Sequence, residues 1–245
     1  MEHFFTAPDK IRDDFILIDG SDVNHIANVL RMRPGDRLMI SDGEGSDYTC
    51  EISRIEEDGI YCSILSSALS RSEPSVKFFL FQGLPKSDKF ETIIRKSVEL
   101  GVYEMIPTVT ARSVVKYDDK KKKAKQQRWQ KISESAAKQS RRGIIPQVRE
   151  IVSFKTALEY ASPLDMILIP YENFKDMKST KETISRIKPG MSVGIFIGPE
   201  GGFETSEVDA AAAAGAKPIS LGSRILRTET APLALLSILM FALEE

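Results

Sequence analysis

The sequence has few of the residues from which metal and redox sites are built. Its 245 residues include two cysteines, two histidines and one tryptophan. Cys50 and Cys62 occur without Cys-x-x-Cys or cysteine–histidine spacing, so we expect no metal site. Two reduced, half-buried thiols are typical of a cytoplasmic protein.

Long hydrophobic runs are absent as well. The longest apolar stretch, residues 231–243, is too short to span a bilayer and predicts a buried helix. The first residues lack the basic region and apolar core of a signal peptide. We therefore expect no membrane partner and a cytoplasmic location.

Common nucleotide-binding motifs are also missing. The chain contains no Gly-x-Gly-x-x-Gly fingerprint and no phosphate-binding loop ending in Gly-Lys-Ser/Thr, which argues against nicotinamide cofactors and nucleoside triphosphates. With 34 basic and 35 acidic residues, the formal net charge is −1. Any affinity for nucleic acid must therefore come from local segregation of charge.

The order of predicted elements divides the chain into two parts. Short strand candidates separated by glycine-rich turns indicate a small β-barrel over residues 1–70, and a serine-rich segment ending at Pro74 predicts a linker at residues 71–75. These strand candidates are residues 15–18, 37–40, 47–55 and 60–65. From 76 to 245, strands and helices alternate, which predicts an α/β domain with a mostly parallel sheet. Pro107 places the strand at residues 105–109 at an edge, or marks the end of that strand.

Two turns late in the chain are the strongest candidates for a ligand site. Residues 197–203 and 221–231 each follow a short apolar run that predicts a buried strand, and each precedes a helix. In a parallel sheet such turns meet at the carboxyl edge, where ligands bind. In the first turn, Gly198-Pro199-Glu200-Gly201-Gly202, glycine allows a sharp turn and close approach to the main chain. A plain strand-to-helix turn is the alternative.

The second turn carries charges that a helix start does not require. Thr228 or Thr230 could cap the last helix, and Glu229 would favour its positive end. Arg224 and Arg227 are misplaced for that role and indicate an anionic partner, either a carboxylate or a phosphate. Taken singly, each arginine could equally be a solvated surface charge.

Basic residues cluster between 112 and 149, including Arg112, Arg128, Arg141 and Arg142. Such clusters bind phosphate backbones by releasing counterions, although a lysine run alone is more often a solvated helix face. Trp129 and a separate barrel favour RNA as the partner.

Five segments together closely resemble the ribosomal RNA small subunit methyltransferase E family, of the SPOUT or α/β-knot class. Two are Ile-Gly-Pro-Glu-Gly-Gly-Phe at 197–203, followed by Glu207, and Leu-Gly-Ser-Arg-Ile-Leu-Arg-Thr-Glu-Thr-Ala at 221–231. Supporting segments are residues 25–31, 86–102 and 128–142. The resemblance covers nearly the whole chain. The first residues depart from it, because Glu2-His3 stands where relatives often carry arginine.

The resemblance implies S-adenosylmethionine-dependent methylation of N3 of one uridine in 16S small-subunit ribosomal RNA. It implies an RNA-binding PUA-like barrel, a 76–245 domain with a deep trefoil knot, and a homodimer. The partner would be ribosomal RNA or the 30S particle. Ribose 2′-O methylation on the same fold, or a non-catalytic RNA-binding or ribosome-assembly factor, are the alternatives.

The resemblance also assigns candidate residues. Cofactor binding is expected at Ile169, Pro170, Gly198, Pro199, Glu200, Gly201, Leu221, Gly222, Ile225, Leu226 and Thr228. RNA binding is expected at Arg31, Arg33, Lys86, Lys89, Arg95, Arg112, Arg128, Arg141, Arg142 and Arg224. For catalysis we expect Arg227 as a cation that stabilises charge on the base, with Glu229 or Glu200 as the general base. Glu229 could instead only cap the helix, and Glu200 only order its turn.

Overall fold

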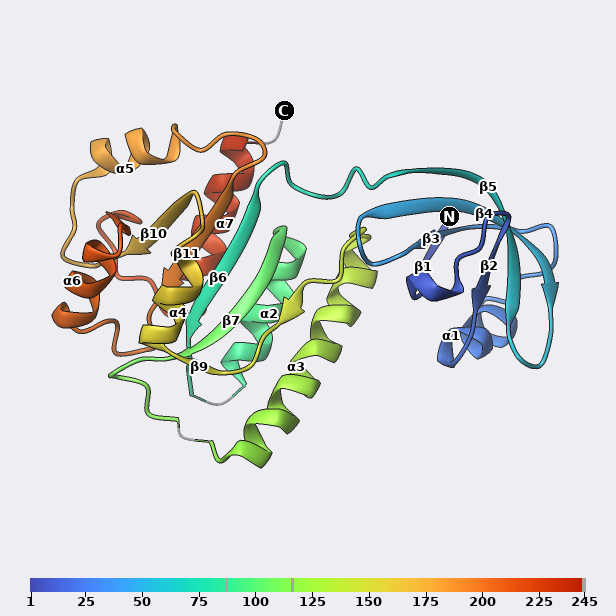
Figure 1. The fold of residues 1–245 in the computed structure, drawn as a ribbon, viewed down its shortest axis with the longest axis horizontal. Helices are drawn as coiled ribbons and strands as arrows, with labels where there is room; N and C mark the ends of the chain where they lie inside the picture. Colours follow the sequence, from blue (N-terminus) through green and yellow to red (C-terminus); the bar gives the residue numbers. More distant parts are fainter. Residues whose placement is uncertain (87, 116, 244–245) are drawn as a thin grey trace. The chain divides into compact units, whose positions relative to one another are not determined.

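The computed structural model describes residues 1–86, 88–115 and 117–243 (Figure 1). Ser87 and Lys116, which belong to the basic or motif segments considered above, lie outside the described residues, as do residues 244–245. The chain divides into two compact units. The N-terminal unit comprises Met1–Glu73 and Ala137–Ile145, and the C-terminal unit comprises Pro74–Ala136 and the chain from Pro146 onwards.

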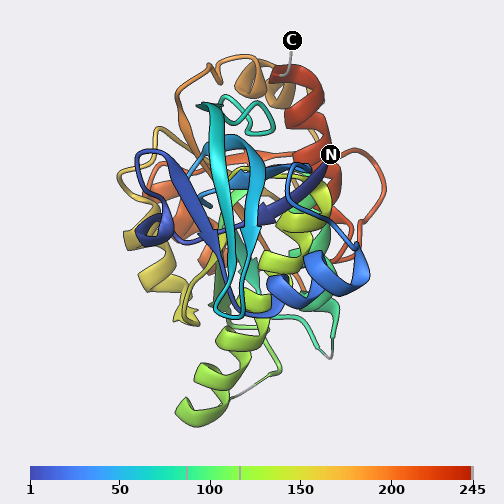
Figure 2. The same cartoon turned by 90° about the vertical axis from the view of Figure 1, so that its right-hand side faces the viewer.

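The N-terminal unit is built on a sheet of five strands, in the order β1-β3-β4-β5-β2 (Figure 2). The strands are β1 (Glu2–Phe5), β2 (Phe15–Ile18), β3 (Arg37–Ser41), β4 (Ser46–Ile55) and β5 (Ile60–Leu69). β1 pairs with β3 in parallel and the other pairs are antiparallel. Alternate side chains fill the interior, as period-two patterning requires; among them Ile16, Leu38, Ile40 and Ile60 are fully buried.

Both cysteines belong to this interior. Burial raises the pKa of the Cys50 thiol to about 11 and that of Cys62 to about 12, so both are neutral and unreactive at physiological pH. A short helix, α1 (Ser21–Asn24), continues into a π-helical turn at His25–Val29 whose Ile26 closes one end of the same core.

Residues 137–145 pack with the barrel strands rather than with the parallel sheet. Glu73 holds this segment, because its carboxylate accepts hydrogen bonds from the Arg142 guanidinium and from the main-chain N–H groups of Gly143 and Ile144. Lys138 adds an ion pair with Asp22 at 2.8 Å. The PUA-like unit is therefore completed by residues that lie far along the chain.

The C-terminal unit contains an entirely parallel sheet in the order β12-β10-β11-β6-β7-β8, with β9 also paired to β7. Its strands are β6 (Lys77–Gly83), β7 (Val102–Val109), β8 (Gln147–Val148), β9 (Val152–Ser153), β10 (Met166–Pro170), β11 (Ser192–Ile197) and β12 (Lys217–Ile219). The α/β class predicted from alternation is confirmed.

Helices cover both faces of this sheet (Figure 1). They are α2 (Lys89–Glu99), α3 (Asp119–Ser140), α4 (Phe154–Ala161), α5 (Met177–Ile184), α6 (Thr205–Ala213) and α7 (Ala231–Leu243). On one face, α4 and α6 pack on Phe81 and Phe196, whose rings stack at 4.4 Å. The opposite-facing Leu80 and Ile195 are equally buried, and there α7 contacts β11 and α2 contacts β7.

Pro107 does not mark an edge strand. β7 pairs with β6 on one side and with β8 and β9 on the other. The two outer strands pair with Glu104–Met105 and with Thr108–Val109, so the outer pairing is interrupted at Pro107. The missing N–H of proline is thereby accommodated inside the sheet.

The chain crosses the carboxyl edge of the sheet twice near its end. After β11 it turns at Gly198 and continues through α6 to β12, which lies beyond β10. Residues 220–230 then return toward β6 and β11, where the Thr228 hydroxyl accepts a hydrogen bond from Gln82 and donates one to the Gly198 carbonyl. α7 follows and packs against α2. This return is the crossing in which the resemblance places the knot.

Candidate functional site

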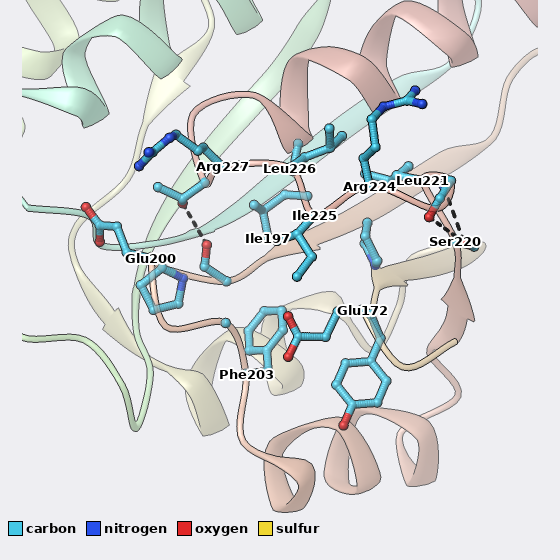
Figure 3. Close-up of a pocket in the computed structure, with 18 of the residues that line it drawn as sticks. Glu172, Ile197, Glu200, Phe203, Ser220, Leu221, Arg224, Ile225, Leu226 and Arg227 are labelled. Atoms are coloured by element: carbon cyan, nitrogen blue, oxygen red, sulfur yellow. Dashed lines mark hydrogen bonds between the residues drawn. The ribbon is translucent and has the colours of Figure 1, made fainter. Parts of the chain in front are cut away.

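A cavity of about 440 Å³ opens where the two late turns meet, within the C-terminal unit (Figure 3). This volume is typical of small-molecule sites. Three chain segments form most of its wall: the residues that follow β10, the turn that follows β11, and the segment between β12 and α7; Lys89 of α2 adds to it. All three are carboxyl ends of parallel strands, so the edge predicted from the sequence carries the cavity.

Most of the residues expected to bind a cofactor line this cavity. They are Pro170, Gly198, Pro199, Glu200, Leu221, Gly222, Ile225, Leu226 and Thr228. Ile169 and Gly201 do not. Ile169 is fully buried in β10 beside Pro218 of β12, and the Gly201 carbonyl accepts a hydrogen bond from Arg112 Nη1 at 2.7 Å.

One part of the wall is apolar. Ile197 and Phe203 are buried beneath it, whereas Ile225 is 81% exposed although it lines the cavity. Figure 3 shows the Ile225 side chain reaching into the space between Ile197 and Glu172. An exposed aliphatic side chain over an open cavity is suited to contact with a flat, apolar ligand surface.

Lys89, the first residue of α2, holds two carboxylates at the rim. Its Nζ lies 3.1 Å from Glu200 Oε1 and 3.5 Å from Glu229 Oε2. Burial alone would raise the pKa of Glu200, but hydrogen bonds from its own N–H, from Lys89 and from the Lys86 N–H together lower that pKa. The hydrogen bond to Glu200 raises the pKa of Lys89. Glu200 and Lys89 are therefore charged at neutral pH, and Glu200 is a weak base.

The other charged side chains on the wall are free to meet a ligand. Arg224, Arg227, Lys175 and Glu172 line the cavity and are exposed. Within residues 1–86, 88–115 and 117–243, no ion pair engages any of these four. Figure 3 shows Glu172 pointing into the cavity and Arg224 extending away from it. Of these two side chains, only the Glu172 carboxylate faces the space that a ligand would occupy.

Comparisons with known proteins place this site in context. A family described as an RNA methyltransferase domain matches residues 72–240, and an RNA methyltransferase PUA domain matches residues 18–65. The ribosomal RNA small subunit methyltransferase E of Bacillus subtilis is 38% identical over 230 residues, covering 93% of this chain and 90% of the relative. The chain belongs to the ribosomal RNA small subunit methyltransferase E family.

Solved structures agree with this assignment to the methyltransferase E family. The Neisseria gonorrhoeae enzyme of that name, bound to S-adenosylmethionine, is 30% identical with a TM-score of 0.81, covering 98% of this chain and 97% of its own. A protein from Legionella pneumophila in complex with S-adenosylmethionine is also 30% identical, with a TM-score of 0.82 over the same shares of the two chains.

The residues expected to bind RNA in this methyltransferase E member are distributed over both units. The N-terminal unit carries Arg31, Arg33, Arg141 and Arg142, and the C-terminal unit carries Lys86, Lys89, Arg95, Arg112, Arg128 and Arg224. Arg142 is only 3% exposed and is held by Glu73. Arg128 pairs with the buried Glu91 at 2.9 Å but keeps much of its side chain exposed.

His3 does not add a positive charge to the surface of the N-terminal unit. His3 Nε2 lies 2.6 Å from Ser41 Oγ, and Ser41 in turn donates to Asp47. Burial lowers the pKa of His3, and Arg141 and Lys138 lower it further against the opposing effect of Asp47. His3 is therefore an uncharged packing residue of β1.

Several residues on the cavity wall of this family member were not among the expected cofactor-binding residues, although Ile197, Gly202, Phe203 and Ala231 lie in the two turns identified from the sequence. They are Tyr171, Glu172, Lys175, Ile197, Gly202, Phe203, Ser220 and Ala231. Most lie within one or two positions of a residue that was expected to bind the cofactor. The end of each predicted strand was therefore the sequence signal that could have identified them.

No described helix has the length and apolarity for a membrane span, and the described His, Cys, Asp and Glu side chains form no group suited to a metal ion.

Proposed function

We propose that this protein transfers a methyl group from S-adenosylmethionine to N3 of a specific uridine in 16S small-subunit ribosomal RNA. The observation that carries the proposal is the cavity formed at the three strand ends by the family's own motif residues. Family membership supports ribosomal RNA as the substrate class. The choice of N3 rests on the resemblance alone and is the part that experiment must test.

The cavity residues fit the proposed cofactor chemically. Leu221, Ile225 and Leu226 offer an apolar surface for the adenine ring. The glycine-bearing turn at Gly198 allows the ligand to approach main-chain groups. Glu172 and Lys175 of the wall can meet the ammonium and carboxylate groups of the amino-acid part of the ligand. When bound, S-adenosylmethionine would supply an electrophilic methyl group, and the thioether left after the bond from sulfur to the methyl carbon breaks would be S-adenosylhomocysteine.

The protein must handle the target base and its proton. The uridine has to leave the base stack to reach the cavity, and the bond from N3 to its proton breaks as the bond from N3 to the methyl carbon forms. We assign Arg227 to stabilise the negative charge that spreads onto the ring carbonyls. We assign the proton to one of the two carboxylates beside Lys89, Glu229 or Glu200, which lie 3.5 Å and 3.1 Å from its Nζ atom.

Two further features belong to the proposal. The exposed Arg31, Arg33 and Arg141 assign RNA binding to the barrel of residues 1–70 and the segment that packs on it, and the basic residues of α3 are assigned to the same function. On α7, Phe241 is 91% exposed and Ile238 is 45% exposed, which favours a second copy of the chain as the partner of that helix. A ribosomal substrate implies a cytoplasmic location.

The test combines binding and transfer. Calorimetry should detect binding of S-adenosylmethionine to the wild-type protein, and labelled methyl groups should appear in 16S RNA of small subunits that lack the modification. Arg227→Ala, with an intact cavity, serves as the matched control for the chemical step. Absence of cofactor binding would contradict the proposal and favour a non-catalytic RNA-binding factor.

A further inference from the structure

A buried polar chain connects the sheet to both late turns. Gln82, near the carboxyl end of β6, is fully buried. Its Nε2 donates to the Gly83 carbonyl at 3.0 Å and to Thr228 Oγ1 at 3.0 Å. Thr228, 5% exposed, donates from the same oxygen to the Gly198 carbonyl at 2.7 Å. The Gln82 side chain thus reaches the segment between β12 and α7 directly, and it reaches the turn after β11 through Thr228.

The carbonyls of Gly83 and Gly198 determine which groups donate and which accept in this series of hydrogen bonds. The carbonyls of Gly83 and Gly198 can only accept hydrogen bonds. The Gln82 atom that faces Gly83 must therefore be the NH₂ group. Because Thr228 has a single hydroxyl hydrogen and gives it to Gly198, it accepts from Gln82. The orientation of the Gln82 amide group therefore determines the orientation of the Thr228 hydroxyl.

The arrangement leaves one acceptor without a partner. Gln82 Oε1 is buried, and among the residues that the structure describes nothing donates to it. A buried polar atom without a partner costs stability, whereas an apolar side chain of the same shape would avoid the cost. Stability alone therefore does not account for glutamine at this position.

We propose that Gln82 is a positioning residue for the cavity. By orienting the Thr228 hydroxyl onto the Gly198 carbonyl, it holds the segment between β12 and α7 against the turn after β11. Both segments line the cavity. The consequence for ligand binding rests on the proposed role of the cavity as the S-adenosylmethionine site, but the ordering of the segment does not.

The test uses substitutions that preserve shape. Gln82→Met removes the carboxamide together with its unpartnered oxygen, and Thr228→Val removes the hydroxyl. Losing one neutral hydrogen bond changes an equilibrium by about threefold to tenfold. We expect each variant to bind S-adenosylmethionine about that much more weakly in calorimetry, with KM raised more than kcat is lowered.

Three comparisons make the result specific. Thr228→Ser keeps the hydroxyl and should recover most of the affinity lost in Thr228→Val. The double variant Gln82→Met/Thr228→Val should be no weaker than the weaker single variant, because both changes break one chain. Gln147→Met, at an exposed position of β8, is the matched control and should bind as the wild type does. Additive losses, or wild-type affinity in Gln82→Met, would overturn the proposal.

Hydrogen exchange in the absence of cofactor separates this inference from the proposed function. In Gln82→Met, main-chain amides of residues 221–230 should exchange faster than in the wild type, while those of β4 keep their rates. Faster exchange in a protein that binds no S-adenosylmethionine would reject the proposed function and keep the positioning role. Unchanged exchange would reject the positioning role itself.

Discussion

Gly83 allows the turn after β11 to pack directly on the end of β6. A Cβ atom at this position would lie 2.7 Å from both Pro199 N and Pro199 Cδ, and 2.9 Å from Gly198 C. Ordinary contact begins at 3.4 Å, so Gly83→Ala displaces the turn by about 3.4 − 2.7 = 0.7 Å. The clashing atoms belong to the backbone and a proline ring, which cannot rotate away.

The expected cost has two parts. Overpacking of this kind destabilises by about 1–3 kcal/mol, which corresponds to a fall in melting temperature of roughly 2–12 °C for a chain of this size. The larger effect should fall on function, since a misplacement of about 1 Å can reduce a rate about a hundredfold. We expect Gly83→Ala to lose cofactor affinity and methyl transfer well below its melting temperature.

Gly194→Ala is the matched control for the loss of stability. Its Cβ would meet side chains in the interior of the sheet, Leu164 Cδ1 at 3.0 Å and Phe81 Cε2 at 3.3 Å, away from the cavity. Scanning fluorimetry should show both variants melting earlier, and calorimetry should show only Gly83→Ala losing affinity for S-adenosylmethionine. Wild-type affinity in a folded Gly83→Ala protein would refute the packing argument.

Three further outcomes are expected. Arg227→Ala should keep the wild-type dissociation constant for S-adenosylmethionine but lose about 10²-fold to 10³-fold in single-turnover rate; an unchanged rate would remove Arg227 from the chemistry. Because the pKa of Glu200 is lowered from 4.5 on folding, its contribution to stability is present above that pH and is lost as the pH falls through the folded value. Urea unfolding of Glu200→Gln should therefore differ from the wild type at neutral pH and converge with it in acid; a constant difference would contradict the ionised state. Arg142→Met leaves the carboxylate of Glu73 without its buried partner, and should destabilise the protein by about 3–5 kcal/mol in the same assay, whereas a loss below about 1 kcal/mol would mean that the pair is dispensable.

The features that the sequence predicted correctly depend on local pattern. Alternation of short apolar runs with amphipathic segments predicted the parallel sheet, and the strand-to-helix turns at residues 197–203 and 221–231 predicted the edge at which the cavity lies. The absence of the common nucleotide-binding motifs can be read directly from the sequence. Each of these inferences uses residues within about one helix or strand of each other.

What the sequence could not predict depends on pairing over long separations. β1 was not predicted, because a strand of four residues has too short a pattern to be recognised without its parallel partner β3. Arg142 looked like part of an exposed basic cluster, yet Glu73, which lies 69 positions earlier, holds it in the interior. Gln82 and Thr228 are 146 positions apart. No local pattern connects such residues, because only the crossing of the chain brings them together.

The most direct test of the account is the identity of the methylated atom. Small subunits lacking the modification would be incubated with the wild-type protein and S-adenosylmethionine, with Arg227→Ala in parallel, and the nucleosides of 16S RNA mapped by mass spectrometry. The account predicts one new 3-methyluridine that is absent from the variant reaction. A methyl group on a ribose, or no methyl group at all, would contradict it.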